Sequence, residues 1–243
     1  MIGRLSGSWS GVSVAYGAVR GNERRQLPDE VASYVREQIM SGRFKPGDFL
    51  RMEPIAEAVG VSNTPVREGL LTLHSEGFVQ LVPRRGFVVA PFTRQDVRDL
   101  FWAQARLAGE LAARAAKKIT PEQIDRLKSV IEQLDEAIAA GDKDRIADLG
   151  HAFHREINLA ADSHRLALLL AGVVRHLPNR FYASLESRVE LTREQHALLV
   201  EALRKRSARK ARTLMEEHVA EGADHVIEML EKTGLWEDEE PES

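Results

Sequence analysis

Residues 50–89 read LRMEPIAEAVGVSNTPVREGLLTLHSEGFVQLVPRRGFVV, and this stretch predicts two short helices followed by a β-hairpin. Pro54 suits the first turn of a helix and Gly60 suits the left-handed residue that ends one, so the first helix should cover residues 53–59. After a tight turn, Pro65 lies near the start of the second helix. The cap of that helix would be one of three polar residues, Ser62, Asn63 or Thr64.

The second helix has an apolar face and an exposed polar end. Val66, Leu70 and Leu73 recur at helical spacing and should pack inward. The side chains left at the exposed N-terminal end are those of Ser62, Asn63, Thr64 and Arg67. In helix-turn-helix proteins this end of the second helix enters the major groove of DNA. The stretch therefore predicts a DNA-reading surface.

A basic hairpin follows the second helix. The runs at residues 78–82 and 87–89 are typical of strands, and Pro83-Arg84-Arg85-Gly86 joins them with turn residues. Two arginines should therefore lie at the tip of the hairpin. We expect Arg84, Arg85 and Gly86 to approach the DNA backbone or minor groove.

These motifs resemble the winged-helix domain of the GntR family of bacterial transcription regulators over residues 27–89. The run Met40-Ser41-Gly42-Arg43-Phe44-Lys45-Pro46-Gly47 resembles the family's Ile-x-x-Gly-x-hydrophobic-x-Pro-Gly turn. The run Val61-Ser62-Asn63-Thr64-Pro65-Val66-Arg67-Glu68 resembles its Val-Ser-Arg-Thr-Pro-Val-Arg-Glu signature. Family members usually carry arginine where this chain has Asn63, and that arginine commonly reads a guanine. Because asparagine suits adenine N6 and N7, we predict an altered operator preference at this step.

The composition indicates a two-domain protein of the cytoplasm. The chain has 243 residues, 43% of them hydrophobic, which suffices for two cores. Because it has no cysteine, it can form neither disulfides nor thiolate metal sites, which is compatible with a reducing compartment. No apolar run approaches the roughly 20 residues of a membrane helix. The N-terminus also lacks the apolar segment of a signal peptide.

The formal net charge of -3 argues mildly against nucleic-acid binding, but the charge is unevenly distributed. Residues 1–90 hold 11 Lys and Arg against 9 Asp and Glu, whereas the rest of the chain holds 23 against 28. We expect residues 236–243 to form an acidic tail, and residues 1–26, rich in Gly and Ser, to form a disordered leader. Three arginines of the leader could instead form a basic arm on DNA: Arg20, Arg24 and Arg25.

The whole chain is therefore expected to be mainly α, with a winged helix-turn-helix domain at residues 27–90, a linker at 91–94 and an all-α bundle of about six helices at 95–235. Thr93 and Asp96 resemble a capping box that starts the first bundle helix, which should end near Lys118. Three further helices should cover residues 121–140, 143–161 and 165–185, the last kinked near Pro178. Thr192 should cap a fifth helix, and Ser207 a sixth that reaches Lys232.

Three histidines lie on inward stripes of three different expected helices: His154, His196 and His218. Taken singly, a histidine of this kind is usually a buried, hydrogen-bonded core residue. Four others have no supporting motif, and we expect them to be structural: His74, His164, His176 and His225.

Together the three histidines resemble the FCD effector domain, which follows the winged helix in the FadR and VanR branches of the GntR family. The resemblance covers about residues 93–232. Phe153-His154, Glu194-Gln195-His196 and Glu216-Glu217-His218 resemble its three histidine motifs, and Arg106-x-x-x-Glu110 resembles the motif of its first helix. The resemblance implies a divalent metal held by three histidines and by an Asp or Asn four residues before the first.

That fourth position is Gly150 here, which supplies no ligand. Three imidazoles with a water or an effector carboxylate could still hold Zn²⁺ or Ni²⁺, while His151, on the preceding turn, should lie to one side. The alternative is that the histidines bind an organic anion through hydrogen bonds alone. Arg106 would clasp an effector carboxylate in a bidentate pair, or else form an ion pair with Glu110.

We therefore expect a homodimeric transcription regulator that binds a near-palindromic operator in double-stranded DNA and responds to a small organic acid in the bundle. It should be neither an enzyme nor a membrane protein. The alternative is a metal-dependent hydrolase-like enzyme that uses the three histidines, although no HExxH, GxSxG or phosphate-cradling glycine loop occurs. A dimerisation scaffold would explain the helices but would leave the arginine hairpin without a role.

Overall fold

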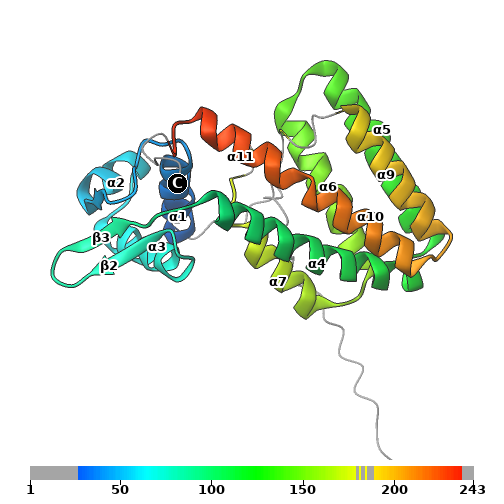
Figure 1. Ribbon diagram of the computed structural model, residues 1–243, viewed down its shortest axis with the longest axis horizontal. Coiled ribbons are helices and arrows are strands. Elements are labelled where there is room, and N and C mark those ends of the chain that lie inside the picture. The colour runs from blue at the N-terminus through cyan, green and yellow to red at the C-terminus, as the bar shows by residue number, and fades with distance from the viewer. Residues whose placement is uncertain (1–26, 179–180, 182–183, 185–188, 237–243) are drawn as a thin grey trace, which may run out of the picture.

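The computed structural model describes residues 27–178, 181, 184 and 189–236. The expected leader at 1–26 and the acidic residues 237–243 lie outside the described residues. Figure 1 shows an N-terminal part with a small sheet and a larger C-terminal part made of helices. Among the residues that can be placed, no helix is long and apolar enough to cross a membrane.

The N-terminal part consists of three helices and a three-stranded sheet. The helices are α1 Leu27–Met40, α2 Met52–Val59 and α3 Asn63–Ser75, and the strands are β1 Phe49–Leu50, β2 Val79–Val82 and β3 Gly86–Val89. The sheet is antiparallel in the order β1-β3-β2. Helix α2 ends at Gly60 with φ 76°, as expected for a left-handed stop. The predicted winged helix-turn-helix fold is thus confirmed.

The inward face of α3 holds this part together. Val66, Leu70 and Leu73 are fully buried, and they share one hydrophobic cluster with Val31 and Ile39 of α1. Burial of such side chains stabilises the fold by about 1.5–3 kcal/mol each. The apolar side of α3 is thereby fixed against α1, which leaves the N-terminal end of α3 facing outward.

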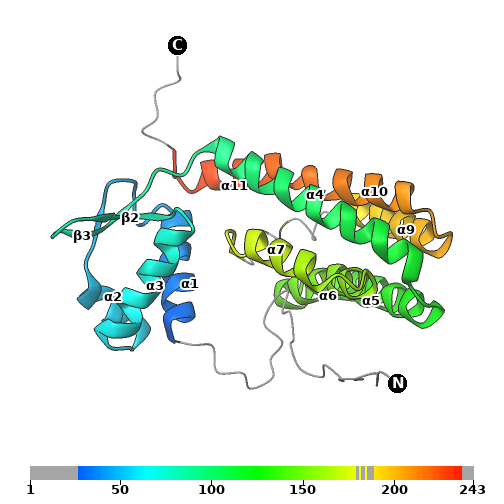
Figure 2. The same cartoon turned by 90° about the horizontal axis from the view of Figure 1, so that it is seen from below.

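The C-terminal part is a helical bundle. Its helices are α4 Arg94–Lys118, α5 Pro121–Ala140, α6 Lys143–Ala160, α7 His164–Val174, α9 Val189–Arg204, α10 Ala208–Ala220 and α11 Gly222–Lys232. Capping boxes start α4 at Thr93 and α5 at Thr120. Seen from below in Figure 2, α4, α10 and α11 lie on one side of the bundle, and α5, α6 and α7 lie on the other.

Three helix boundaries differ from those expected. Helix α7 ends at Val174 and a turn follows it, so the single kinked helix at 165–185 is wrong. Helix α9 begins before Thr192, which is buried within the helix and is not its cap. The expected sixth helix is divided at Glu221 into α10 and α11. Proline and capping patterns are local, whereas these boundaries depend on how neighbouring helices pack.

The two parts share one hydrophobic core. Val226 and Leu230 of α11 and Phe101 of α4 belong to the same buried cluster as Val31 and Ile39 of α1. Figure 1 shows α11 running from the bundle to the N-terminal part. An acidic tail beginning at residue 236 is therefore a wrong boundary, because Trp236 is 5% exposed in this core. Its indole Nε1–H donates to the carbonyl oxygen of Phe92 in the linker.

Gly42 and Thr233 lie at the closest approach of the two parts. Gly42 has φ +71°, and a Cβ added to it would lie 2.7 Å from the carbonyl oxygen of Thr233. The Thr233 hydroxyl donates to the carbonyl oxygen of Met40 over 3.3 Å. The glycine of the turn after α1 therefore serves both a left-handed backbone and a contact with the end of α11.

Candidate functional sites

The N-terminal end of α3 presents polar side chains to solvent. Ser62, Asn63, Thr64 and Arg67 are all exposed, whereas the neighbouring Pro65 and Val66 are buried. Ser62 occupies the N-cap position in extended conformation, but its side chain makes no capping hydrogen bond. Its hydroxyl and the first N–H groups of α3 can therefore bond an outside partner such as a DNA phosphate or base edge.

The hairpin tip carries two exposed arginines. Arg84 has a left-handed φ of 63°, and the Arg85 N–H donates to the Val82 carbonyl oxygen over 3.1 Å, which closes the turn. The Arg85 guanidinium lies 4.4 Å from the centroid of the Phe49 ring on β1. Phe49 pairs with Val88 across the sheet. The third strand thus positions Arg85 through a cation–π contact, a role for Phe49 that the sequence motifs did not reveal.

Three histidines from three helices meet inside the bundle. His154 lies on α6, His196 on α9 and His218 on α10, and one nitrogen of each lies within 4.8 Å of the other two. His196 is 1% exposed and stacks on Phe153 with ring centroids 3.9 Å apart. The Nε2 atoms of His154 and His218 are 3.3 Å apart. We refer to these three residues as the histidine cluster.

The spacing within the histidine cluster fits a divalent metal. Zn–N bonds of about 2.0–2.1 Å at tetrahedral angles put two ligand nitrogens roughly 3.3 Å apart. The Nε2 atoms of His154 and His218 have this separation. Two neutral imidazoles that face each other with Nε2 atoms need something between or beside them to bond both lone pairs, which a cation does.

Gln195 and Glu221 orient His218. The Nδ1–H of His218 donates to the Gln195 side-chain oxygen over 2.8 Å, and the Gln195 amide nitrogen donates to Glu221 over 2.8 Å. This chain of hydrogen bonds leaves the lone pair of His218 on Nε2, the atom that faces His154. Such outer partners are typical of metal-ligating histidines. Gln195 stood next to His196 in the sequence, but only the packing of α9 against α10 shows what it contacts.

The remaining histidines have other surroundings. His151 is buried on α6, but it does not belong to the histidine cluster found among the described residues. His74 bonds the Val79 carbonyl oxygen, His176 the Gly172 carbonyl oxygen, and His225 the Ser184 hydroxyl. Gly150 is buried on α6 and offers no side-chain ligand.

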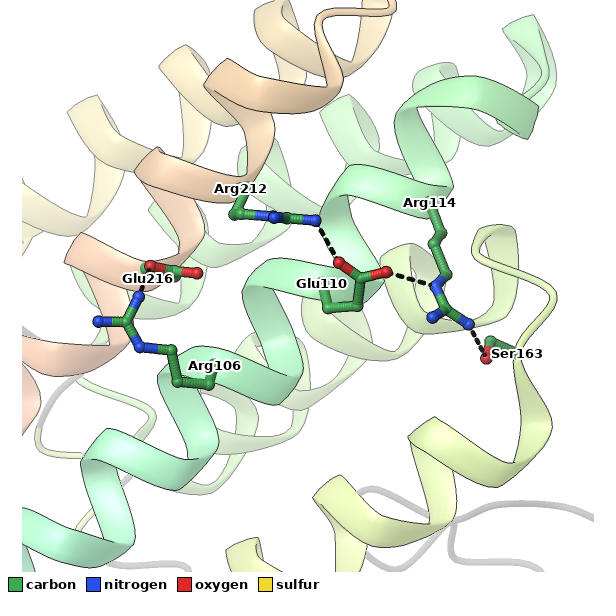
Figure 3. Close-up of polar contacts among 6 residues, drawn as sticks. All are labelled: Arg106, Glu110, Arg114, Ser163, Arg212 and Glu216. Carbon is green, nitrogen blue, oxygen red and sulfur yellow. Dashed lines mark hydrogen bonds and ion pairs between the residues drawn. The ribbon is translucent and has the colours of Figure 1, made fainter.

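Arg106 lies in an ion-pair network between α4 and α10 (Figure 3). It pairs with Glu216 of α10, and its side chain is 58% exposed. Glu110 pairs instead with Arg114, over 2.7 Å, and with Arg212. The Arg114 hydrogen bond, together with the charges of Arg212 and Arg114, holds the pKa of Glu110 below its usual value. The expected pair of Arg106 with Glu110 is therefore not the one formed.

Gly109 brings α4 and α10 close together beneath this network. A Cβ on Gly109 would lie 2.5 Å from Cγ of Glu216, so the Glu216 side chain lies directly over the glycine. Figure 3 shows Arg106 and Glu110 on either side of this point. The network therefore depends on a small residue that no charge pattern in the sequence identifies.

Comparison with known proteins supports two domains. The description "Bacterial regulatory proteins, gntR family" matches residues 27–89, and "FCD domain" matches residues 99–221. The HTH-type transcriptional repressor RspR of Escherichia coli is 25% identical over 221 residues, which cover 90% of this chain and 97% of RspR. The HTH-type transcriptional regulator YdhC of Bacillus subtilis is 24% identical over 201 residues, which cover 82% and 90%.

A solved structure has the same fold. The structure of McbR/YncC of E. coli covers 86% of this chain and 99% of its own, with 24% identity and a TM-score of 0.60. The matched families and relatives are transcription regulators, not enzymes. The chain therefore belongs to the GntR family of bacterial regulatory proteins, and it is a DNA-binding transcription regulator with an FCD domain.

Proposed function

We propose that this regulator binds a near-palindromic operator as a homodimer, and that a small organic acid held at the histidine cluster changes its affinity for DNA. Residues 27–90 would read the operator and residues 95–235 would bind the effector and the second subunit. The observation that carries the proposal is the meeting of His154, His196 and His218 inside a bundle whose last helix shares a core with the DNA-binding part. Action on chromosomal DNA would place the protein in the cytoplasm.

The exposed end of α3 would read base edges in the major groove. Ser62, Asn63, Thr64 and Arg67 supply its donors and acceptors, and Asn63 would favour an adenine. Arg84, Arg85 and Gly86 of the hairpin would contact the backbone or the minor groove. Binding-site selection from random duplexes tests this assignment: recovery of a guanine at the step read by Asn63 would contradict it.

The histidine cluster would hold a divalent metal such as Zn²⁺ or Ni²⁺. A bound metal would supply a Lewis acid whose open positions attract a carboxylate. The chain's own contribution is to hold three imidazoles close together and to fix the His218 tautomer through Gln195. The alternative is that the imidazoles bond the acid directly. Metal analysis of protein purified without chelator, compared with His196→Ala, decides between the two.

Arg106 could assist only by exchanging partners. It now pairs with Glu216 and is more than half exposed, so an effector carboxylate would have to replace that glutamate. The comparison of Arg106→Gln with Glu216→Gln separates the two roles. If Arg106 clasps the acid, only Arg106→Gln should weaken acid binding, whereas a purely structural pair predicts the same small effect for both.

Helices α4 and α7 offer a surface for the second subunit. They pack against each other, and each leaves large apolar side chains exposed: Trp102 on α4 is 63% exposed, and Leu168 and Leu169 on α7 are 43% and 61% exposed. Such side chains at a shared surface are typical of a subunit interface. Leu169→Glu should shift the protein from dimer to monomer in sedimentation, whereas Leu81→Glu, at an exposed leucine of the sheet, should not.

The regulatory step is tested with DNA. A gel shift with the promoter upstream of the protein's own gene, with and without candidate sugar acids, hydroxy acids and aromatic acids, should reveal an acid that changes the affinity. The same acid should raise the melting temperature of the free protein. His196→Ala should abolish the response to the acid while leaving binding to DNA. A response that persists in His196→Ala would contradict the proposed site.

A further inference from the structure

A second pocket lies where α6 ends and α7 begins. Its volume is about 160 Å³, and none of the residues of the histidine cluster lines it. The lining combines polar groups from the last turns of α6, Arg155 and Asn158, with the start of α7 at Ser163 and His164. Leu159 and Ala167 add apolar surface.

The polar lining contains buried donors that have no acceptor. The Nδ2 of Asn158 and the Nε of Arg155 are buried and form no hydrogen bond. Asn158 as a whole is only 8% exposed. In the part of the chain that the structure describes, no acidic side chain pairs with Arg155. Buried donors are nearly always bonded in folded proteins, so these two indicate an acceptor that is not part of this chain.

The N-terminus of α7 adds further donors to the same pocket. Ser163 is the N-cap residue, but its side chain accepts no hydrogen bond from the first turn of α7. Its hydroxyl instead accepts from Arg114 over 2.9 Å (Figure 3). The first N–H groups of α7, which spans eleven residues, therefore lack a side-chain cap. They stand at the positive end of the helix dipole, which favours an anion.

The charges around the pocket leave a positive excess. The acid in the lining, Asp162, already pairs with Lys118 over 2.8 Å, and this contact holds the pKa of Asp162 below its usual value. Asp162 therefore does not compensate Arg155. A ligand that supplies acceptors and one negative charge would satisfy Arg155, Asn158 and the start of α7 together.

We propose that this pocket binds a small organic carboxylate, as an acid site separate from the histidine cluster. The carboxylate would bond Arg155 and Asn158, and its short carbon chain would lie against Leu159 and Ala167. An apolar protein cavity of about 150 Å³ holds a molecule of the size of benzene, so the pocket is large enough for a short dicarboxylic acid. The apolar lining favours an organic acid over inorganic phosphate.

Isothermal titration of metal-free, full-length protein with malonate tests the proposal. Arg155→Gln should weaken malonate binding by about tenfold or more, because a charge-assisted hydrogen bond is lost. Asn158→Ala should weaken it by several-fold, and serves as a second variant if Arg155→Gln fails to fold. Arg165→Gln is the matched control, since Arg165 is an exposed cation of α7 that does not line the pocket. Its affinity should change less than about twofold, because screening weakens exposed charges.

Further arms separate this site from its alternatives. His196→Ala should leave malonate binding unchanged, so a loss there would assign the malonate to the histidine cluster and overturn a separate site. Inorganic phosphate should bind more weakly than malonate, and tighter phosphate binding would overturn the organic ligand. If Arg155→Gln left the affinity unchanged but dissociated the protein to monomers in sedimentation, the pocket would be a subunit contact. Equal losses in Arg155→Gln and Arg165→Gln would reduce the effect to general electrostatics.

Discussion

Replacing Trp236 with alanine should loosen the junction between the DNA-binding part and the bundle. The indole is 5% exposed, shares the cluster of Val31 and Leu230, and lies 4.6 Å from the guanidinium of Arg94. A tryptophan buries about 150–250 Å², which corresponds to about 4–6 kcal/mol at about 25 cal/mol per Å². Because alanine retains part of that contact, Trp236→Ala should lower the free energy of unfolding by about 3–5 kcal/mol.

Trp236→Phe separates packing from hydrogen bonding. Phenylalanine keeps most of the apolar contact but loses the N–H that donates to Phe92, so its cost should be about 1–2 kcal/mol. Lys232→Ala, at an exposed position near the end of α11, is the control and should stay within about 0.5 kcal/mol.

Urea unfolding followed by circular dichroism measures these free energies, and hydrogen exchange localises the change. Amides of α1 should exchange faster in Trp236→Ala, since α1 packs on the same cluster. Two results would refute the reasoning: an unfolding free energy within about 1 kcal/mol of Lys232→Ala, or unchanged protection of α1 despite a loss of stability elsewhere.

Three further predictions concern α4 and the hairpin. Gly109→Ala should force Glu216 off α4 and lower the melting temperature by several degrees, and an unchanged temperature would show that Glu216 moves freely. Because the hydrogen bond from Arg114 depresses the pKa of Glu110, the stability from this pair should be fully present above the usual value of 4.5 and be lost as the pH falls below it. Glu110→Gln should thus lower the melting temperature at pH 7 but not at pH ~2.5, and an equal drop at both would contradict the pair. Arg84→Ala should reduce the salt dependence of DNA binding, by about 0.9 in the slope of log K against log salt for each phosphate contact removed, and an unchanged slope would place Arg84 away from the phosphates.

Much of the fold was predictable because its signals are local. Pro54 and Gly60 bound α2, and the capping boxes at Thr93 and Thr120 start α4 and α5, each through groups a few residues apart. The same local pattern at Thr192 was misleading, since a Thr-x-x-Gln sequence also fits inside a helix. Whether such a pattern caps a helix depends on the residues before it and on what they pack against.

The candidate sites divide in the same way. The apolar face of α3 at Val66 and Leu70 implied, without any structure, that Ser62, Asn63 and Arg67 would be exposed, because helical periodicity alone separates the two faces. The histidines were found one at a time by their stripes and grouped only by a family resemblance. Their spacing and the hydrogen bond from His218 to Gln195 come from the packing of α6, α9 and α10.

By itself, then, the sequence determined the helices with clear caps, the reading end of α3 and the basic hairpin, since each follows from interactions within one or two turns of chain. Tertiary structure alone decided that Arg106 pairs with Glu216, 110 residues away, that Trp236 joins the core of α1, and that Arg155 and Asn158 meet the start of α7 at one pocket. These contacts join segments whose separation along the chain carries no periodic signal. They are fixed by which apolar faces bury together and by which charges that burial brings within reach.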